Sequence, residues 1–294
     1  MTMDNSEKFI KSVQRFSARH FDHKNHLPTL NSCLEKVTKG ARDLQVGQDN
    51  PLPFILKVET ETLLHIVADL NNSLLLSLSN GLYSSVEALS RVALENTINL
   101  VYINEEDDTR RAKSLLKSYL TTSRDRGEKW LDFAVLTKDE GSEQRARAFF
   151  DNLKFVKDLL PLFRDPKVKG WSDARARFKA VGLENLYHIL YAPTCNSVHS
   201  FSEDIYNQML LEYTAPEFKL EIFKSIEAEK TSFAYYLATN AVLLYADAVQ
   251  RLAAKLENND VEDSVFEVEG TLWGLIKEHE SLTDEYYKEV SESA

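Results

Sequence analysis

Polar side chains that could carry acid–base or ligand chemistry gather in the stretch Leu183–Ser200, LENLYHILYAPTCNSVHS. Four of them recur every four residues: Tyr187, Tyr191, Cys195 and His199. On a continuous helix they would form one slowly drifting polar line, because residues four apart share a face. Imidazole titrates near neutral pH, so His199 could give or take a proton. The alternative interpretation is a polar seam inside a helical bundle, with His199 as a hydrogen-bonded core residue.

Pro193 lies in the middle of this stretch. Proline has no amide hydrogen to donate and clashes one turn back, so we expect the helix to kink or end there, freeing backbone carbonyls beside a pocket. Cys195 would act as a nucleophile only if its thiolate were stabilised, and the alternative is an inert thiol. The other cysteine, Cys33, forms no CxxC pair with it, so we expect two reduced thiols.

A second group of charged side chains lies in residues 84–103, SSVEALSRVALENTINLVYI. This segment is apolar on nearly all sides, which predicts a buried helix. Glu87, Arg91 and Glu95 nevertheless follow one another at intervals of four, on one stripe. Charges in a buried helix must be paired, because desolvation is costly for each ion. We expect either a structural ion pair between Arg91 and the two carboxylates, or a guanidinium beside a cleft that binds phosphate or carboxylate.

Acidic and basic residues are distributed unevenly along the 294 residues, whose net charge is −11. Residues 257–294 contain 12 acidic and 2 basic residues, whereas residues 110–179 contain 18 basic and 10 acidic residues. Solvated helix faces would explain both runs. The alternative is a basic middle segment that meets a polyanion such as RNA, with an acidic tail that competes for it.

Helical periodicity runs through nearly the whole chain, and no alternating strand pattern is bounded by turn signals. The prediction is an all-α bundle of about ten helices without a sheet. We expect one domain over residues 1–256, followed by an acidic helix or appendage over residues 257–294. Ser142 is the expected N-cap of the sixth helix. The helices are expected near residues 5–21, 28–47, 54–81, 84–104, 108–130, 142–162, 171–181, 184–200, 203–213, 216–256 and 261–290.

Motifs for nucleotide, zinc, calcium and serine-hydrolase sites are missing from the sequence, so we expect no cofactor and no metal ion. Glu61, His65 and Asp69 share a helix face; a metal site there is the alternative to a solvated stripe. The longest apolar stretch, residues 235–249, is too short to cross a membrane and predicts a buried core helix. Because no apolar region follows the N-terminal charges, we expect a cytoplasmic protein without membrane contact.

The segment of residues 171–200, WSDARARFKAVGLENLYHILYAPTCNSVHS, resembles the signature of a bacterial family known only as domain of unknown function 5677. An Arg-x3-Glu pair in an earlier helix belongs to the same family pattern, and Arg91 with Glu95 fits it. The resemblance covers roughly residues 67–213 and implies no particular activity. The residues that match the signature in order are Trp171, Gly182, Tyr187, Tyr191, Val198 and His199.

The family pattern has a serine where this chain has Cys195. A hydroxyl role at that place would therefore pass to Thr194 or Ser197.

A weaker similarity is to the HEPN-type helical ribonucleases, which use an Arg-x4–6-His motif without metal near a dimer interface. Residues 192–194 contain no arginine, so the motif is missing before His199, and Arg91 would have to supply the guanidinium in space. Two other pairs fit the spacing, at a frequency that chance explains: Arg15 with His20, and Arg19 with His26.

Two functional hypotheses follow. In the first, a non-enzymatic binding or interaction protein, suited to a bacterial stress or phage-defence system, has a polar centre that keeps helices in register or binds a small anion. In the second, a HEPN-like metal-independent ribonuclease, His199 moves a proton and Arg91 stabilises phosphate charge. RNA, a small anion and a second copy of the chain are the candidate partners. The expected polar centre consists of Arg91, Glu95, Tyr187, Tyr191 and His199, with Trp171, Cys195 and Ser197 nearby.

Overall fold

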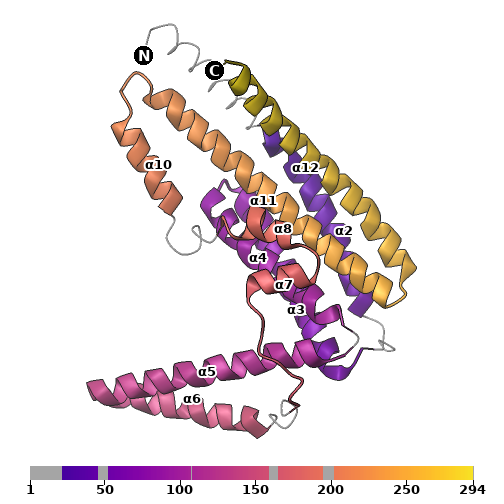
Figure 1. The fold of residues 1–294 in the computed structure, drawn as a ribbon, viewed down its shortest axis with the longest axis vertical. Coiled ribbons are helices and arrows are strands. Elements are labelled where there is room, and N and C mark those ends of the chain that lie inside the picture. The colour runs from indigo at the N-terminus through magenta and orange to yellow at the C-terminus, as the bar shows by residue number, and fades with distance from the viewer. Residues whose placement is uncertain (1–21, 46–51, 107, 159–164, 195–201, 294) are drawn as a thin grey trace.

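The computed structural model describes residues 22–45, 52–106, 108–158, 165–194 and 202–293. Within these ranges the chain forms ten α-helices, one 3-10 helix and one π-helix, and no strand (Figure 1). The all-α prediction is therefore confirmed for the described ranges. The helix expected near residues 5–21 lies outside them.

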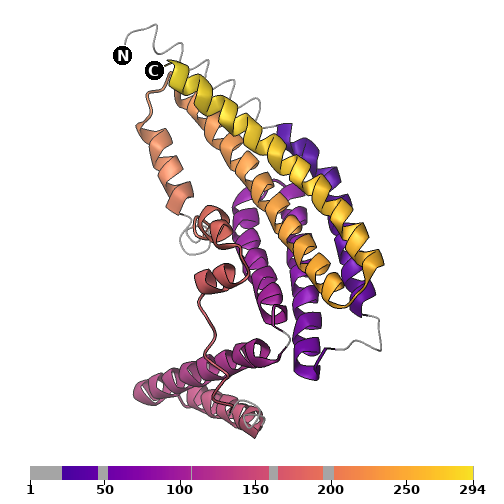
Figure 2. The ribbon, with the colours of Figure 1, turned by 45° about the vertical axis from the view of Figure 1, so that its right-hand side comes forward.

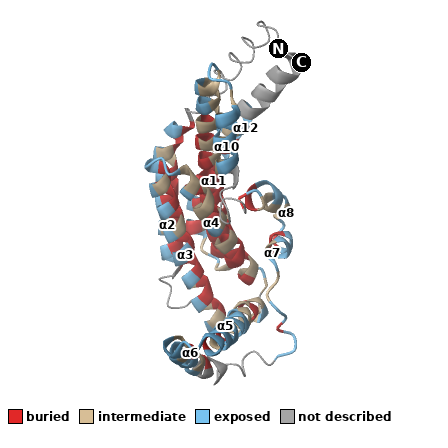
Figure 3. Ribbon diagram, turned by 90° about the vertical axis from the view of Figure 1, so that its left-hand side faces the viewer, coloured by how far each residue is buried: buried red, intermediate tan, exposed pale blue. Residues whose placement is uncertain are grey.

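Helix α11 (Lys219–Lys255) is the central element of the bundle. It packs against α2 (Leu27–Gln45), α3 (Phe54–Ser79), α4 (Tyr83–Asn104) and α12 (Asn259–Ser293). Its apolar middle, predicted from residues 235–249, is buried on nearly every side, as Figure 3 shows. A helix that is apolar all round can lower its free energy only by being surrounded, so the other four helices assemble around it.

Helix α4 is also buried along most of its length, as its all-round apolar pattern predicts. Val86, Ala93, Leu94 and Ile98 are each at most 1% exposed. The helix packs against α3 on one side and α11 on another. Its remaining side carries Arg91 and Glu95 and faces the segment that follows the α5–α6 hairpin, so α4 joins the core to the polar residues.

The connection between α3 and α4 is a tight turn at Gly81. Its φ angle of +71° lies in the left-handed region, which glycine adopts without a steric penalty. The Leu82 amide donates to the Ser77 carbonyl (2.9 Å) and the Gly81 amide donates to the Leu78 carbonyl (3.1 Å). These bonds satisfy carbonyls at the end of α3 and send α4 back antiparallel to it.

Helix α12 lies along α11 and α2 (Figure 2). Every third or fourth residue on its inner side is apolar and buried, so this acidic segment contributes a full helix face to the core. None of the described helices is long and apolar enough to cross a membrane. The buried residues of this face are Val261, Val265, Val268, Leu272 and Ile276.

Helices α5 (Arg110–Thr137) and α6 (Glu140–Asp158) form a hairpin that projects from the bundle (Figures 1 and 2). The prediction that Ser142 caps α6 is wrong. Asp139 precedes the helix, and its Oδ1 accepts a hydrogen bond from the Ser142 amide (3.0 Å). The carboxylate takes this place because its oxygen reaches the free amides of the first turn and its charge suits the helix N-terminus.

Residues 165–194 cover one flank of the bundle, packing against α4. They contain α7 (Ala174–Ala180), α8 (Glu184–Leu186) and the π-helix η3 (Tyr187–Tyr191). In its described part, the helix expected near residues 184–200 consists of α8 followed by η3, and its irregularity lies next to Pro193, where a kink or an end was expected. The Ala192 amide bonds to the Tyr187 carbonyl, five residues back (2.8 Å), so the helix widens just before Pro193. Proline disfavours the ordinary α-helical turn there, since its ring clashes with the carbonyl four residues earlier.

The last described helix before α11 is α10 (Ser202–Tyr213), which packs against α11. Pro216 was expected in the first turn of the long helix, but α11 begins at Lys219. Residues 216–218 form a turn, in which the Phe218 amide donates to the Ala215 carbonyl (2.9 Å).

The buried carboxyl group of Glu59 makes stability depend on pH. Glu59 lies on the same face of α3 as the buried Leu56 and Leu63, and its two oxygens find no hydrogen-bond partner among the described residues. Burial raises its pKa from 4.5 to about 8. The folded protein thus holds a proton that the unfolded chain releases. Its contribution to stability is fully present below pH 4.5 and is lost as the pH rises to about 8.

We predict that Glu59→Gln raises the free energy of unfolding at pH 8 by about 1–3 kcal/mol and flattens its decline between pH 5 and pH 8. Denaturant unfolding at the two pH values measures both effects. Glu61→Gln, on the same helix but beside Lys57, is the matched control and should leave the decline unchanged. An equally steep decline in wild type and Glu59→Gln would contradict the assignment.

Close packing in the hairpin requires a glycine at position 127. A Cβ atom there would lie 2.9 Å from Cε1 of Phe149 and 3.0 Å from Cζ of Phe150. Gly127→Ala should therefore destabilise the protein by about 1–3 kcal/mol, despite the better helix propensity of alanine. Gly141→Ala, whose Cβ would approach nothing closer than 3.5 Å, should instead be neutral or stabilising. Thermal unfolding of the two variants compares them directly, and equal shifts would refute the close-packing argument.

Candidate functional site

The polar centre consists of Arg91, Glu95, Arg177 and Tyr191, held in one hydrogen-bond network. Helix α4 supplies Arg91 and Glu95, α7 supplies Arg177, and the π-helix supplies Tyr191. The Arg91 guanidinium donates to the Tyr191 hydroxyl (3.1 Å), and that hydroxyl donates to Oε2 of Glu95 (2.8 Å). The Arg177 guanidinium donates to Oε1 of Glu95 (2.8 Å). The network therefore joins α4 to two segments that lie 82 to 100 residues later in the sequence.

The partner of Glu95 differs from the one expected from the sequence. Glu95 takes its two hydrogen bonds from Arg177 and Tyr191, whereas Arg91 bonds to the tyrosine hydroxyl. Arg91 and Glu95 lie on the same face of α4, as their spacing predicts. Helix α7 packs against α4 at Glu95, however, and its Arg177 pairs with this carboxylate. Glu87, one turn before Arg91, is half-buried.

Arg177 is the member of the polar centre that sequence reasoning missed. Its side chain is only 5% exposed. One guanidinium nitrogen donates to the Ser172 carbonyl, and the guanidinium carbon lies 5.0 Å from the centre of the Trp171 ring. Burial lowers the pKa of Arg177, and the neighbouring Glu95 carboxylate opposes that shift. Its place in the sequence could have indicated burial. Arg177 lies next to the buried Phe178 and one turn before the buried Val181, on the inner side of α7.

Aromatic rings surround the polar centre. The Arg91 guanidinium carbon lies 4.6 Å from the centre of the Tyr191 ring, a cation–π distance. Tyr187 stacks on Tyr191 with ring centres 5.4 Å apart, and Phe178 lies 5.4 Å from Tyr191. Tyr191 is therefore fixed by packing on its rings and by hydrogen bonds at its hydroxyl, so the position of the hydroxyl is set before any ligand arrives.

The hydrogen-bond network contains two guanidinium groups and one carboxylate. The Nε atoms of Arg91 and Arg177 are buried and have no hydrogen-bond partner among the described residues. A buried donor without an acceptor costs free energy, so both atoms favour an additional acceptor. The Glu95 side chain is 33% exposed, which means that the network reaches the protein surface.

Three predicted site residues, Cys195, Ser197 and His199, lie outside the described residues. Thr194 is described and buried, and its hydroxyl donates to the carbonyls of Leu190 (3.0 Å) and Tyr191 (2.9 Å). That hydroxyl therefore closes the π-turn rather than facing a ligand.

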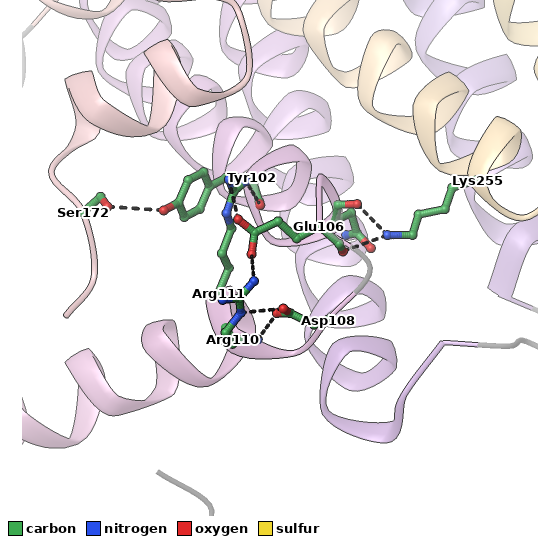
Figure 4. A network of polar contacts seen from close by, with 8 residues as sticks. Tyr102, Glu106, Asp108, Arg110, Arg111, Ser172 and Lys255 are labelled. Atoms are coloured by element: carbon green, nitrogen blue, oxygen red, sulfur yellow. Dashed lines mark hydrogen bonds and ion pairs between the residues drawn. The ribbon is translucent and has the colours of Figure 1, made fainter. Parts of the chain in front are cut away.

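A second network surrounds Tyr102 at the end of α4 (Figure 4). The Tyr102 ring meets Trp171 edge-on, with ring centres 5.3 Å apart, and its hydroxyl is 3.3 Å from that of Ser172. Arg111 stacks on the Tyr102 ring at 4.1 Å and donates to its carbonyl (2.9 Å), and it pairs with Glu106 (3.0 Å). The start of α5 thus fixes the ring on which Arg177 rests.

Among the described residues, no three His, Cys, Asp or Glu side chains lie close enough together to bind one metal ion. His65 and Asp69 are both exposed. Burial raises the pKa of the Cys33 thiol, which favours the protonated form.

Three histidines that sequence reasoning did not connect meet beside α11. His23 stacks on His279 with ring centres 4.4 Å apart, and its Nδ1 is 2.9 Å from the Ser232 hydroxyl. His26 lies 3.3 Å from the Glu278 carboxylate. These contacts tie the 3-10 helix η1 (Asp22–His26) to α11 and α12.

The ion pair between the buried Arg177 and the partly exposed Glu95 should contribute to stability. Arg177→Met would leave Glu95 without its cation, so we predict a loss of about 1–3 kcal/mol in the free energy of unfolding. Arg175→Met is the matched control, since Arg175 is 58% exposed and pairs with Glu184. That change should cost no more than about 1 kcal/mol. Denaturant titration followed by circular dichroism compares the variants, and similar losses would contradict a buried role for Arg177.

Comparison with curated proteins and with solved structures gives no match. Residues 62–212 match a family described as a family of unknown function, DUF5677. The matched region contains all four members of the polar centre and extends from α3 to the end of α10. Because it spans more than half of the chain, the protein belongs to the DUF5677 family.

Proposed function

We propose that this protein is a non-enzymatic helical binding protein whose polar centre receives the phosphate or carboxylate group of a small ligand. The observation that carries the proposal is the buried Nε of Arg91, a donor without an acceptor among the described residues, in a network with two guanidinium groups and one carboxylate. An anion would supply the missing acceptor in a charge-assisted hydrogen bond.

The surroundings of Arg91 suit this role. Tyr191 lies under the guanidinium and accepts a bond from one of its terminal nitrogens, which restricts the side chain before binding. A guanidinium held in this way loses little conformational freedom when it forms two parallel bonds to an oxyanion. The π-turn that positions Tyr191 is a helix irregularity frequent at functional sites.

Binding is favoured over catalysis by the chemistry of the described groups. The polar centre offers guanidinium, carboxylate and phenol groups, and in its described part no imidazole. Both oxygens of the Glu95 carboxylate already accept hydrogen bonds within the protein, from Arg177 and Tyr191. The ribonuclease alternative depends on His199, which would have to approach Arg91. A role in bacterial stress or phage defence is a further hypothesis, compatible with either activity.

Isothermal titration with inorganic phosphate tests the proposal. Arg91→Met should weaken binding at least about tenfold, since a charge-assisted pair is lost, and Arg91→Lys should restore it only in part. Arg175→Met, which removes an exposed charge from the same flank, is the control and should bind like wild type. Circular dichroism verifies that each variant is folded.

Two results would overturn the proposal. Wild-type protein that binds neither phosphate nor acetate would exclude an anion site at the polar centre. RNA cleavage in EDTA that is lost in His199→Ala would replace the binding function with the ribonuclease function.

A further inference from the structure

A stripe of aromatic and basic side chains runs along the exposed side of α5. Tyr119, Arg126, Trp130 and Phe133 follow one another at intervals of seven, four and three residues, which places them on one helix face. Tyr119 and Phe133 are each 63% exposed, and Trp130 is 38% exposed. We call these four residues the α5 stripe. Burying such rings is ordinarily favourable, so their exposure indicates a contact surface.

The stripe contains no acidic residue. Arg126 lies within it, Lys129 lies at its edge, and both side chains are exposed. The opposite side of α5 differs, because Arg124 there pairs with Asp125 (3.1 Å) and Glu128 (3.7 Å). The positive charge of Arg124 is therefore balanced by neighbouring carboxylates, whereas the stripe itself has no carboxylate to balance Arg126.

The fold leaves the stripe uncovered. Helix α5 turns a narrow side toward α6, where Gly127 and Ala134 are buried. Trp130 lies at the border of that contact, with its ring 6.5 Å from the ring of Phe149. The hairpin projects from the bundle (Figures 1 and 3), and the exposure of Tyr119 and Phe133 shows that no core helix covers these two rings. The acidic helix α12 packs on α11 and α2, away from the hairpin.

Charge and ring chemistry together select the partner. Residues 110–179 carry a net charge of +8 in a chain whose net charge is −11, so this region attracts a polyanion. Flat rings between cations bind bases by stacking while the cations contact the backbone phosphates. A duplex keeps its base faces covered, and an acidic peptide would leave the rings without a partner. Single-stranded nucleic acid can stack its bases on the rings and place its phosphates beside the cations.

We propose that the α5 stripe binds single-stranded nucleic acid, with Tyr119, Trp130 and Phe133 stacking on bases and Arg126 and Lys129 contacting phosphates. This surface is separate from the polar centre, and the two functions can be tested independently.

Fluorescence anisotropy with a labelled oligothymidine of roughly 16 nucleotides measures the interaction on the full chain. A ribonuclease cannot cleave this probe, so binding is separated from any activity. Phe133→Ala and Tyr119→Ala should each weaken binding about fivefold or more, because each loses one stacked base. Tyr206→Ala is the matched control, since Tyr206 is also 63% exposed but lies on α10. It should bind like wild type.

Charge variants test the other half of the surface. Arg126→Ala should reduce the slope of log affinity against log salt by about 0.7, as expected for one phosphate contact on a single strand. Arg124→Ala should leave the slope unchanged, because Arg124 lies on the opposite side of the helix and is paired with Asp125 and Glu128. A duplex of the same length should bind more weakly than the single strand.

Three outcomes would overturn the proposal. Wild-type protein that does not bind the oligothymidine excludes the surface. Equal effects of Arg124→Ala and Arg126→Ala would indicate a general charge effect, and equal effects of Tyr206→Ala and Phe133→Ala would show that stacking is not specific to the stripe. Equal affinity for the duplex, or binding to anionic phosphatidylserine vesicles in place of the oligothymidine, would assign the stripe to a different partner.

Discussion

The carboxylate of Glu95 joins the helical core to the segment that covers its flank. It accepts one hydrogen bond from Arg177 and one from Tyr191, and through Tyr191 it positions Arg91. Without this acceptor, two guanidinium groups would meet in a partly buried place and repel each other. The position of α7, the orientation of the π-turn and the location of the Arg91 donor therefore all depend on one carboxylate projecting from the exposed side of a buried helix.

The bundle can present that carboxylate accurately because its core is rigid. Helices α4 and α11 are apolar on nearly all sides and are enclosed by α2, α3 and α12, so α4 has little freedom to rotate or slide. The hairpin has the opposite character. It buries few side chains and exposes aromatic rings and cations, and its connection to the core runs through the Tyr102 and Arg111 contacts at its base. One chain thus carries a fixed polar centre and a protruding contact surface.

Sequence patterns predicted the core better than the polar centre. The all-round apolar character of residues 84–103 and 235–249 predicted that these helices are buried, because a helix without a polar face must be enclosed. Arg91, Glu95 and Tyr191 were singled out by their spacing, and they do meet. Arg177 was not, since in WSDARARF it looks like one of several surface cations. Its burial depends on α7 crossing α4, a contact between residues distant in the chain.

By itself, the sequence determined the helical class, the burial of its two most apolar helices and the uneven distribution of charge, because periodicity and composition are local properties. Tertiary structure decided which charges pair, since the partner of Glu95 is Arg177, 82 residues away. It also decided that Tyr119, Trp130 and Phe133 remain exposed, whereas Tyr245 is buried among the helices of the core. Hydrogen bonds and desolvation depend on neighbours that only the folded chain brings together, and the spacing of residues along the sequence does not specify those neighbours.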